Sequence, residues 1–329
     1  MLKDTFGRKH TYLRISLTER CNLRCTYCMP AQGIQLAPKA HLMTADEIYT
    51  IASTFVNAGV TKIRLTGGEP LVRKDAQKIL EKLASLPVEL AISTNAITTD
   101  RHIETFKKLG IRNINVSLDT LIPERFKSIT RRDYFDRVYA NIFQLVANGF
   151  NVKLNCVLMK GVNEDEIIDF IKLSEKHLLH IRFIEFMPFD GNRWDMSKLV
   201  SYQEILDCVG TAFAKADVQR ITDRPNDTSR NYRIRGYKGT FAIISTVTNP
   251  FCDSCNRIRL TANGQIKNCL FSAAETDLLT PLRAGESITP LIESAIKEKF
   301  KTRGGMDTLD KFKDPSNYEK NRSMIAIGG

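Results

Sequence analysis

The alternating run Tyr12-Leu-Arg-Ile-Ser-Leu17 leads into the segment Cys21-Asn-Leu-Arg-Cys25-Thr-Tyr-Cys28. Alternation predicts a β-strand with one covered face, and α/β folds place their active sites at the carboxyl ends of such strands. Three cysteines do not complete a structural zinc site, which takes four Cys or His ligands. They can hold a [4Fe-4S] cluster and leave one iron open for an exogenous ligand. The sequence therefore predicts an open-iron cluster on the first cysteine set (Cys21, Cys25 and Cys28), with zinc as the alternative.

Between residues 12 and 187, short β-like runs alternate with amphipathic helical stretches, such as the one that carries Ile48, Ile51 and Phe55. This rhythm is typical of repeated βα units around a parallel sheet. We therefore expect an α/β fold in which residues 1–221 form an incomplete (β/α)6 barrel of the TIM type. Residues 222–329 are expected to form a small C-terminal α+β domain. The predicted barrel strands are residues 12–17, 61–66, 88–94, 111–118, 152–158 and 180–186.

The predicted strands have one apolar and one polar face. A parallel strand covered on both faces reads instead as a near-continuous apolar run. If helices cover the apolar face, the polar face lines a lumen, and basic side chains in a lumen require an anionic partner. We expect a cavity that binds an anion, with an open, solvated sheet face as the alternative. The polar face carries Arg14, Ser16, Arg64, Thr66, Ser93, Asn95, Asn113, Asn115, Ser117, Lys153 and Asn155.

A second cysteine set (Cys252, Cys255 and Cys269) lies in the C-terminal part of the chain. Short β-like runs at residues 231–235, 240–245, 257–260 and 265–270 surround it, after a turn-rich stretch at residues 222–230. No histidine follows His180 in the sequence, so a fourth zinc ligand is again missing. A second open-iron [4Fe-4S] cluster is therefore predicted, and a zinc ribbon is the alternative.

Two motifs accompany the cysteines. Gly67-Gly-Glu-Pro70 follows the second predicted strand, where glycines let a ligand approach the backbone, although a plain strand-to-helix turn explains it equally well. Arg257 and Arg259 share one face of a strand while Ile258 takes the other. Paired guanidiniums suit phosphate or purine recognition, and a solvated surface hairpin is the alternative.

The composition excludes several classes of protein. The chain is 43% hydrophobic and 26% charged, as in globular proteins, and no apolar run approaches the ~20 residues of a membrane span. The N-terminal residues lack the apolar stretch of a secretory signal, so a cytoplasmic protein without a membrane partner is expected. The net charge is +11, yet no more than two basic residues stand side by side. Nucleic-acid arms carry blocks of about five or more, so an anionic small substrate is favoured over a nucleic acid.

The combination of motifs is similar to one family. The two cysteine sets, Tyr27, the Gly-Gly-Glu-Pro stretch, the Asn-Arg-Ile-Arg259 run after Cys255 and the terminal Gly328-Gly329 pair occur together. They resemble the radical S-adenosylmethionine (SAM) GTP 3′,8-cyclases of molybdenum cofactor biosynthesis, over nearly the whole chain. The first cysteine motif alone indicates only the radical SAM superfamily. The terminal diglycine alone is also compatible with disorder.

The resemblance implies a lyase with two [4Fe-4S] clusters. The first cluster would bind SAM and, once reduced, cleave it to a 5′-deoxyadenosyl radical, which takes hydrogen from C3′ of GTP. The resulting carbon radical would add to C8 of guanine. The product would be (8S)-3′,8-cyclo-7,8-dihydroguanosine 5′-triphosphate. The second cluster would anchor the purine of GTP.

The resemblance also implies roles for individual residues. The implied SAM contacts are Tyr27, Gly68, Ser117 and Met187. The implied GTP contacts are Arg14, Arg64, Ser93, Lys153, Arg182, Arg257, Ile258 and Arg259, and the implied catalytic residues are Arg14, Arg257, Arg259, Gly328 and Gly329. Ser93-Thr-Asn-Ala96 departs from the Thr-Thr-Asn-Gly usual in the family. Ser93 keeps the hydroxyl group of the family's threonine, whereas the sequence does not specify how Ala96 affects the local turn.

The implied partners are GTP, a downstream cyclic pyranopterin monophosphate synthase, an external electron donor and a second copy of the chain in a homodimer. Two other hypotheses remain. One is a different radical SAM enzyme with an auxiliary cluster, acting on a peptide. The other is a zinc-bearing nucleic-acid-binding module, motivated by the net positive charge and the Cys-x2-Cys pairs.

Overall fold

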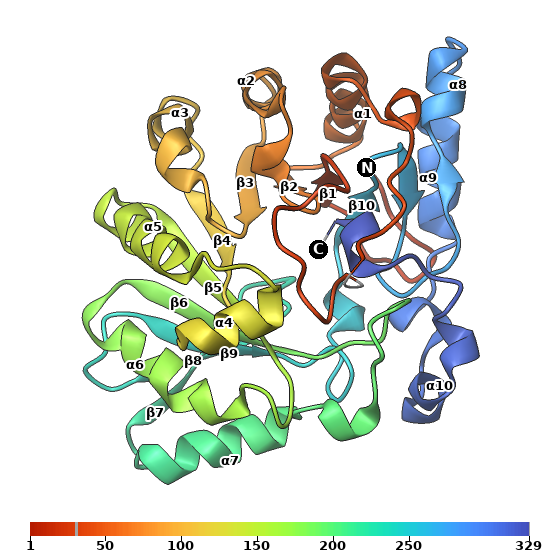
Figure 1. The fold of residues 1–329 in the computed structure, drawn as a ribbon. Helices are drawn as coiled ribbons and strands as arrows, with labels where there is room; N and C mark the ends of the chain where they lie inside the picture. Colours follow the sequence, from red (N-terminus) through yellow and green to blue (C-terminus); the bar gives the residue numbers. More distant parts are fainter. Residues whose placement is uncertain (30–31, 329) are drawn as a thin grey trace.

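The computed structural model describes residues 1–29 and 32–328, and its strands form one mixed sheet of twelve strands (Figure 1). Six strands lie side by side in sequence order, and all of their pairings are parallel. They are β1 (Tyr12–Ser16), β2 (Lys62–Thr66), β3 (Glu89–Thr94), β4 (Asn113–Ser117), β5 (Asn151–Leu158) and β6 (Leu179–Glu185). The six predicted strands are thus confirmed, to within two residues at each end.

Helices follow the strands and cover the outer side of the curved sheet (Figure 1). In α1 the predicted apolar positions Ile48, Ile51 and Phe55 are buried, and Thr44 with Glu47 forms a capping box at its start. Within the described parts of the chain, no helix combines the length and apolar character needed to cross a membrane. The helices are α1 (Ala45–Asn57), α2 (Ala76–Ala84), α3 (Ile103–Lys108), α4 (Pro123–Thr130), α5 (Phe135–Ala147), α6 (Ile167–Lys176), α7 (Tyr202–Ala212), α8 (Leu279–Arg283), α9 (Thr289–Lys297) and α10 (Leu309–Lys313).

The C-terminal strands join the same sheet at both of its edges. β9 (Thr240–Ile244) pairs in parallel with β6, and β10 (Arg257–Leu260) pairs in parallel with β1. The sheet continues antiparallel through β8 (Arg230–Ile234) and β7 (Val218–Ile221) on one side, and through β11 (Gln265–Lys267) and β12 (Thr276–Asp277) on the other. β7 and β12 have no predicted counterpart. The separate C-terminal domain and its boundary after residue 221 stay predictions.

The apolar faces of the strands form the core beneath the helices. Leu13, Ile15, Ile63, Leu65 and Val116 have at most 1% of their surface exposed. Their polar neighbours along each strand point to the opposite, inner side of the sheet, as the alternation predicts. The polar inner face leaves the space in which the candidate site lies.

Candidate functional site

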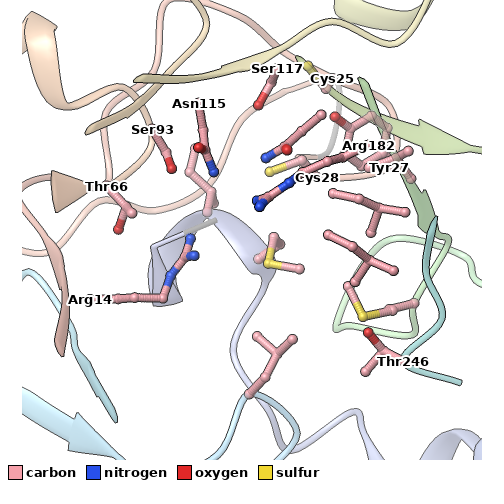
Figure 2. A pocket seen from close by; sticks show the side chains of 18 of the residues that line it. Arg14, Cys25, Tyr27, Cys28, Thr66, Ser93, Asn115, Ser117, Arg182 and Thr246 are labelled. Carbon is pink, nitrogen blue, oxygen red and sulfur yellow. The ribbon is translucent and has the colours of Figure 1, made fainter. Parts of the chain in front are cut away.

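One cavity of about 340 Å³ receives side chains from both parts of the chain. Figure 2 shows polar side chains from opposite walls, among them Arg14, Ser93 and Arg182, pointing into the same space. Both cysteine sets line it. The predicted site residues in its wall are Arg14, Cys21, Cys25, Tyr27, Cys28, Gly68, Ser93, Ser117, Arg182, Met187, Cys252, Cys255, Arg257, Arg259 and Cys269.

The loop that carries the first cysteine set is held against the Gly-Gly-Glu-Pro turn after β2. Gly68 N donates to Thr18 O at 2.7 Å, and Glu69 N donates to Arg20 O at 2.8 Å. A Cβ at Gly68 would lie 2.4 Å from Arg20 O. Glycine is therefore required at position 68, because any side chain there would collide with the backbone of the cysteine loop.

Burial raises the pKa of every thiol in the first set. The pKa of Cys21 rises to about 11 and that of Cys28 to about 12. For Cys25 burial, Asp119 and the two other thiols raise the pKa well above its ordinary value. Iron ligation needs thiolates, so these cysteines become ligands only when a strongly cationic group offsets their burial. Three thiols in this state around one cavity fit an iron-sulfur cluster.

The cysteines do not form a site for a single ion. Within residues 1–29 and 32–328, no three His, Cys, Asp or Glu side chains converge closely enough to hold one metal ion. A [4Fe-4S] cluster binds its cysteines through different irons, so the ligands stand farther apart than in a mononuclear site.

Tyr27 has a partner that the sequence analysis missed. Its hydroxyl donates to Asp119 Oδ2 at 2.8 Å, and Val157 N donates to Asp119 Oδ1 at 2.9 Å. Burial raises the pKa of Asp119 to about 6. Asp119 stands just beyond Ser117 at the end of β4, so the strand-end position that draws attention to Ser117 could also have indicated it.

The second cysteine set lies among cations. Arg303 N donates to Cys252 Sγ at 3.4 Å. Burial raises the pKa of Cys252. At Cys255 burial acts in the same direction, but the charges of Lys299 and Arg257 outweigh it and lower the pKa. Lys299 and Arg303 line the cavity and were not predicted, because no local motif separates them from other basic residues.

Buried guanidiniums make the lining of the cavity basic. Burial, with nearby arginines, lowers the pKa of Arg182 to about 10 and that of Arg259 to about 9. Arg182 Nε and Arg257 Nη1 are buried and have no hydrogen-bond partner among the described residues. Buried cationic donors without partners are costly. The cavity therefore suits an anionic ligand.

Three predicted GTP contacts surround the cavity without lining it. Arg64 donates through Nη1 to Ile92 O at 3.0 Å and through Nε to the Tyr12 hydroxyl. Burial lowers the pKa of Lys153 to about 7, and the charges of Arg182 and Arg64 add to the effect. Arg64 and Lys153 therefore add positive charge beside the cavity without forming part of its lining. Ile258 is fully buried in the apolar core, so its side chain faces away from the cavity.

The C-terminal tail contacts two arginines of the cavity lining. Gly328 O accepts from Arg14 Nη2 at 3.4 Å and from Arg259 Nη1 at 3.5 Å. Gly328 has a φ of 79°, and a Cβ there would lie 2.5 Å from Thr66 Oγ1, so this position also requires glycine. The predicted catalytic residue Gly329 lies outside the described residues.

The turn after β3 holds Ala96, at the position where the sequence departs from the family pattern, in a glycine-like conformation. Ala96 has a φ of 61°, in the left-handed region that glycine adopts readily and alanine does not. Its carbonyl accepts from Asn141 Nδ2 at 2.7 Å and from Thr99 Oγ1 at 3.2 Å. These bonds hold the turn, and Ser93 keeps its hydroxyl-bearing side chain in the cavity wall.

The parallel βα sheet and the three-cysteine loop after its first strand define the class of protein. Residues 15–174 match the family model described as Radical SAM superfamily, and residues 179–304 match the model described as Molybdenum Cofactor Synthesis C. The crystal structure of Streptococcus suis SuiB bound to S-adenosylmethionine superposes with a TM-score of 0.59, covering 88% of this chain and 68% of that chain. Sequence identity is 16%, so this match shows the fold alone.

Relatives of known name narrow the class further. GTP 3′,8-cyclase, mitochondrial, of Arabidopsis thaliana is 48% identical over 100% of this chain and 84% of that protein. GTP 3′,8-cyclase of Listeria welshimeri is 40% identical over 100% of this chain and 99% of that protein. This chain belongs to the GTP 3′,8-cyclase family. Molybdenum cofactor biosynthesis protein 1 of Homo sapiens is 44% identical over 99% of this chain, which spans 51% of the human protein.

Proposed function

We propose that this protein is an enzyme that converts GTP to (8S)-3′,8-cyclo-7,8-dihydroguanosine 5′-triphosphate in molybdenum cofactor biosynthesis. The observation that carries the proposal is the single cavity lined by both cysteine sets and by Arg14, Arg182, Arg257 and Arg259. Such a cavity brings a radical source and an anionic nucleotide together, and its buried walls exclude water from a reactive intermediate. Two relatives named GTP 3′,8-cyclase support the same substrate.

The cofactors proposed are SAM and two [4Fe-4S] clusters. The superfamily match supports SAM and an iron-sulfur cluster on the first cysteine set, and the chemistry of the second set supports the second cluster. When bound, the first cluster supplies the electron that cleaves SAM to methionine and a 5′-deoxyadenosyl radical. Tyr27, fixed by Asp119, would contact SAM together with Gly68, Ser117 and Met187.

The arginines would bind and orient the substrate. Guanidiniums make bidentate contacts with phosphate, and buried donors without partners gain most from such contacts. Arg64 and Lys153 would add positive charge from beside the cavity, while Ser93 would offer a hydroxyl group. Ile258 could take part only through its backbone. The second cysteine set would hold the cluster that anchors the purine.

The architecture is proposed to be an incomplete (β/α)6 barrel, β1 to β6, with residues 222–329 as a C-terminal domain for the second cluster. The parallel order of the six strands and the outer helices support the barrel. We also propose an external electron donor, a downstream cyclic pyranopterin monophosphate synthase and a homodimer. Together with a cytoplasmic location, these stay predictions.

The decisive experiment is an anaerobic assay of the reconstituted protein with SAM, a reductant and GTP. We expect 5′-deoxyadenosine and a cyclised nucleotide by mass spectrometry, both dependent on GTP. If the protein instead modifies a peptide and forms no product from GTP, the peptide alternative is supported. A SuiB structure bound to precursor peptide SuiA shares this fold with a TM-score of 0.57.

Metal analysis tests the zinc alternative separately. Protein purified under argon should contain about eight iron atoms per chain if two cubes are present. Colourless protein that contains zinc would contradict both proposed clusters.

The proposed catalytic role of the tail has its own test. Removal of the two terminal glycines takes away the Gly328 carbonyl that Arg14 and Arg259 contact. We expect unchanged iron content and SAM binding but a loss of cyclisation of roughly tenfold or more, the effect of about 1.4 kcal/mol. Full activity in the truncated protein would show that the tail is dispensable.

A further inference from the structure

The loop between β7 and β8, residues 222–229, has no part in the reaction proposed above, yet it contacts the basic lining of the cavity. Asn226 O accepts from Arg257 Nη2 at 2.9 Å. Thr228, two residues further on, lines the cavity. The loop therefore contacts one of the guanidiniums proposed to bind the nucleotide.

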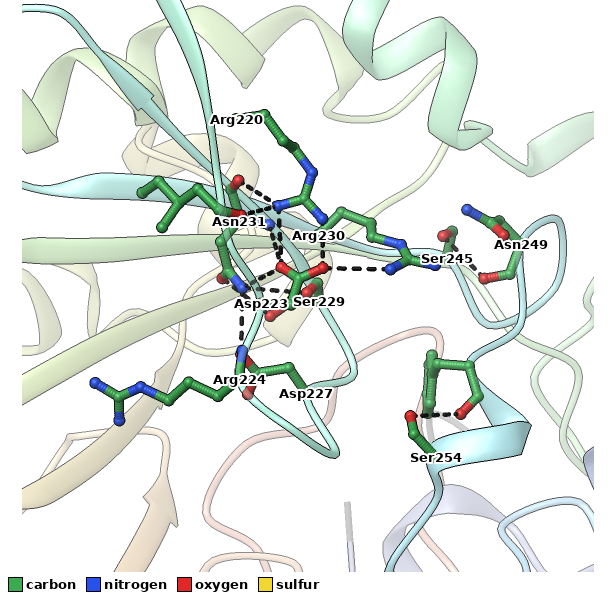
Figure 3. A network of polar contacts seen from close by, with 12 residues as sticks. Arg220, Asp223, Arg224, Asp227, Ser229, Arg230, Asn231, Ser245, Asn249 and Ser254 are labelled. Carbon is green, nitrogen blue, oxygen red and sulfur yellow. Dashed lines mark hydrogen bonds and ion pairs between the residues drawn. The ribbon is translucent and has the colours of Figure 1, made fainter.

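The base of this loop is firmly built. Figure 3 shows the Asp223 carboxylate between Arg220, Arg230 and Asn231. Asp223 Oδ1 accepts from Asn231 N at 3.1 Å and from Asn231 Nδ2 at 2.8 Å. Burial would raise the pKa of Asp223, but these partners lower it to about 2. The Asp223 carboxylate therefore stays ionised at neutral pH and can keep these partners.

The tip of the loop is held by fewer contacts. Asp227 Oδ2 accepts from Arg224 N at 3.0 Å and from Asn231 Nδ2 at 3.3 Å, and Asp227 N donates to Arg224 O at 3.1 Å. Asn226 has a φ of 66°, a conformation that asparagine tolerates better than most residues. The tip is thus held by fewer hydrogen bonds than the Asp223 carboxylate at the base.

Asp227 stands between Asn226, whose carbonyl contacts Arg257, and Thr228, which lines the cavity. The pKa of Lys153 and that of Arg182 are lowered by burial and by neighbouring cations, and the charge of Asp227 acts against both shifts. The Asp227 carboxylate and the Asn226 carbonyl thus compensate part of the positive charge of the cavity. An anionic substrate would compensate the same charge.

We propose that Asp227 and the Asn226 carbonyl are an internal counter-charge that polyphosphate displaces, so that residues 222–229 act as a charge-operated gate to the substrate site. The inference rests on the proposed function. A phosphate group on Arg182 or Arg257 brings a second negative charge toward Asp227. In this proposal, binding displaces the loop tip, and part of the binding free energy is used to do so. Ligands without phosphate do not meet this barrier, and the gate weakens only the binding of polyanions.

The test compares Asp227→Asn with Asp217→Asn in the holoenzyme under anaerobic conditions. Both changes remove one negative charge from the same hairpin, but Asp217 stands at its other end, paired with Arg235 at 3.5 Å. Asparagine keeps the acceptor oxygen that Arg224 N uses. By calorimetry we expect Asp227→Asn to bind GTP and inorganic tripolyphosphate roughly three- to tenfold more tightly, with a smaller gain at high salt. Guanosine binding should not change, and Asp217→Asn should match the parent.

Each outcome decides a separate point. Unchanged or weaker polyphosphate binding in Asp227→Asn overturns the gate. Equal tightening for guanosine also overturns it, because a charge-independent loosening of the loop would then explain the gain. Asp227→Glu, which keeps the charge, should retain parental affinity. If the parent binds tripolyphosphate more weakly than Asp227→Asn but does not bind GTP, the gate stands and the proposed function fails.

Hydrogen exchange tests the displacement itself. The Asp227 amide donates to Arg224 O in this structure, so it should be protected in the free holoenzyme. Addition of GTP should raise its exchange rate at least several-fold, while the amide of Asn231 at the loop base stays protected. Unchanged exchange at Asp227 at saturating GTP would show that the loop does not move.

Discussion

Lys153 is a residue whose charge depends on what the cavity contains. Burial, with Arg182 and Arg64, lowers its pKa to about 7, so the amine of the free protein becomes neutral as the pH rises through that value. We expect GTP affinity to fall several-fold between about pH 6.5 and about pH 8.5, since a neutral amine no longer attracts phosphate. Lys153→Arg keeps its charge at every accessible pH and should remove this part of the dependence. Calorimetric titrations at several pH values would measure both slopes, and equal slopes would contradict the assignment.

Single residues also show how far the sequence predicts the site. The strand period of two correctly put Arg14, Ser93 and Ser117 on the inner face, because that period follows from backbone geometry alone. The same period turns Ile258 into the core, although family resemblance had suggested it as a contact. Thr246 lines the cavity from a turn and Arg303 from a short 3-10 helix, Arg303–Gly305, and no local pattern specifies where such residues will point.

At the scale of elements, the contact between the first cysteine loop and the turn after β2 is open to test. A methyl group at Gly68 would meet Arg20 O at 2.4 Å, which forces the two segments apart at a cost of about 1–3 kcal/mol. We expect Gly68→Ala to lower the unfolding temperature and to lose the first cluster, so that iron falls from about eight to about four per chain. Iron analysis and SAM binding would measure this.

Gly210 provides the matched control for that substitution. It lies in α7, and a Cβ there would have no neighbour within 4 Å. Gly210→Ala should leave the iron content unchanged and raise stability by up to about 1 kcal/mol, as expected in a helix interior. Equal iron loss in both variants would show that the Gly68 contact does not position the cluster loop.

The strands also show which features of the fold cannot be predicted from the sequence. The six parallel strands could be located because each has its own alternating pattern within one βα unit. β7 and β12 were missed because they are short and form the two edges of the sheet. The pairing of Arg14 with Arg259 across β1 and β10 joins residues far apart in the sequence. Such a pairing is specified by tertiary packing, so the sequence could indicate both strands without indicating that they are neighbours.

At the scale of the whole molecule, the N-terminal segment ties the ends of the fold together near the second cysteine set. Arg8 Nη1 donates to Cys252 O at 2.8 Å and to Lys301 O at 2.7 Å. Its Nε donates to Asp4 Oδ2 at 2.6 Å, and His10 Nε2 lies 3.1 Å from the same oxygen. The group is almost completely buried, so it can be removed only with a loss of tertiary packing.

His10 makes this junction sensitive to pH. Burial and the charge of Lys299 lower its pKa to about 4 from the ordinary 6.5. Between these values the unfolded chain binds a proton that the folded chain does not, so stability is full above about pH 6.5 and falls as the pH drops toward 4. The total loss is of the order of 3 kcal/mol, with about 2 kcal/mol of it reached by pH 5. Thermal unfolding of the anaerobic holoenzyme at pH 7 and pH 5 would measure it.

His10→Gln, which cannot gain the proton, should start less stable at pH 7 and lose less stability on acidification, whereas His41→Gln at an exposed position should follow the parent. If all three proteins lose the same stability, the acid sensitivity arises elsewhere and His10 only fills space in the junction.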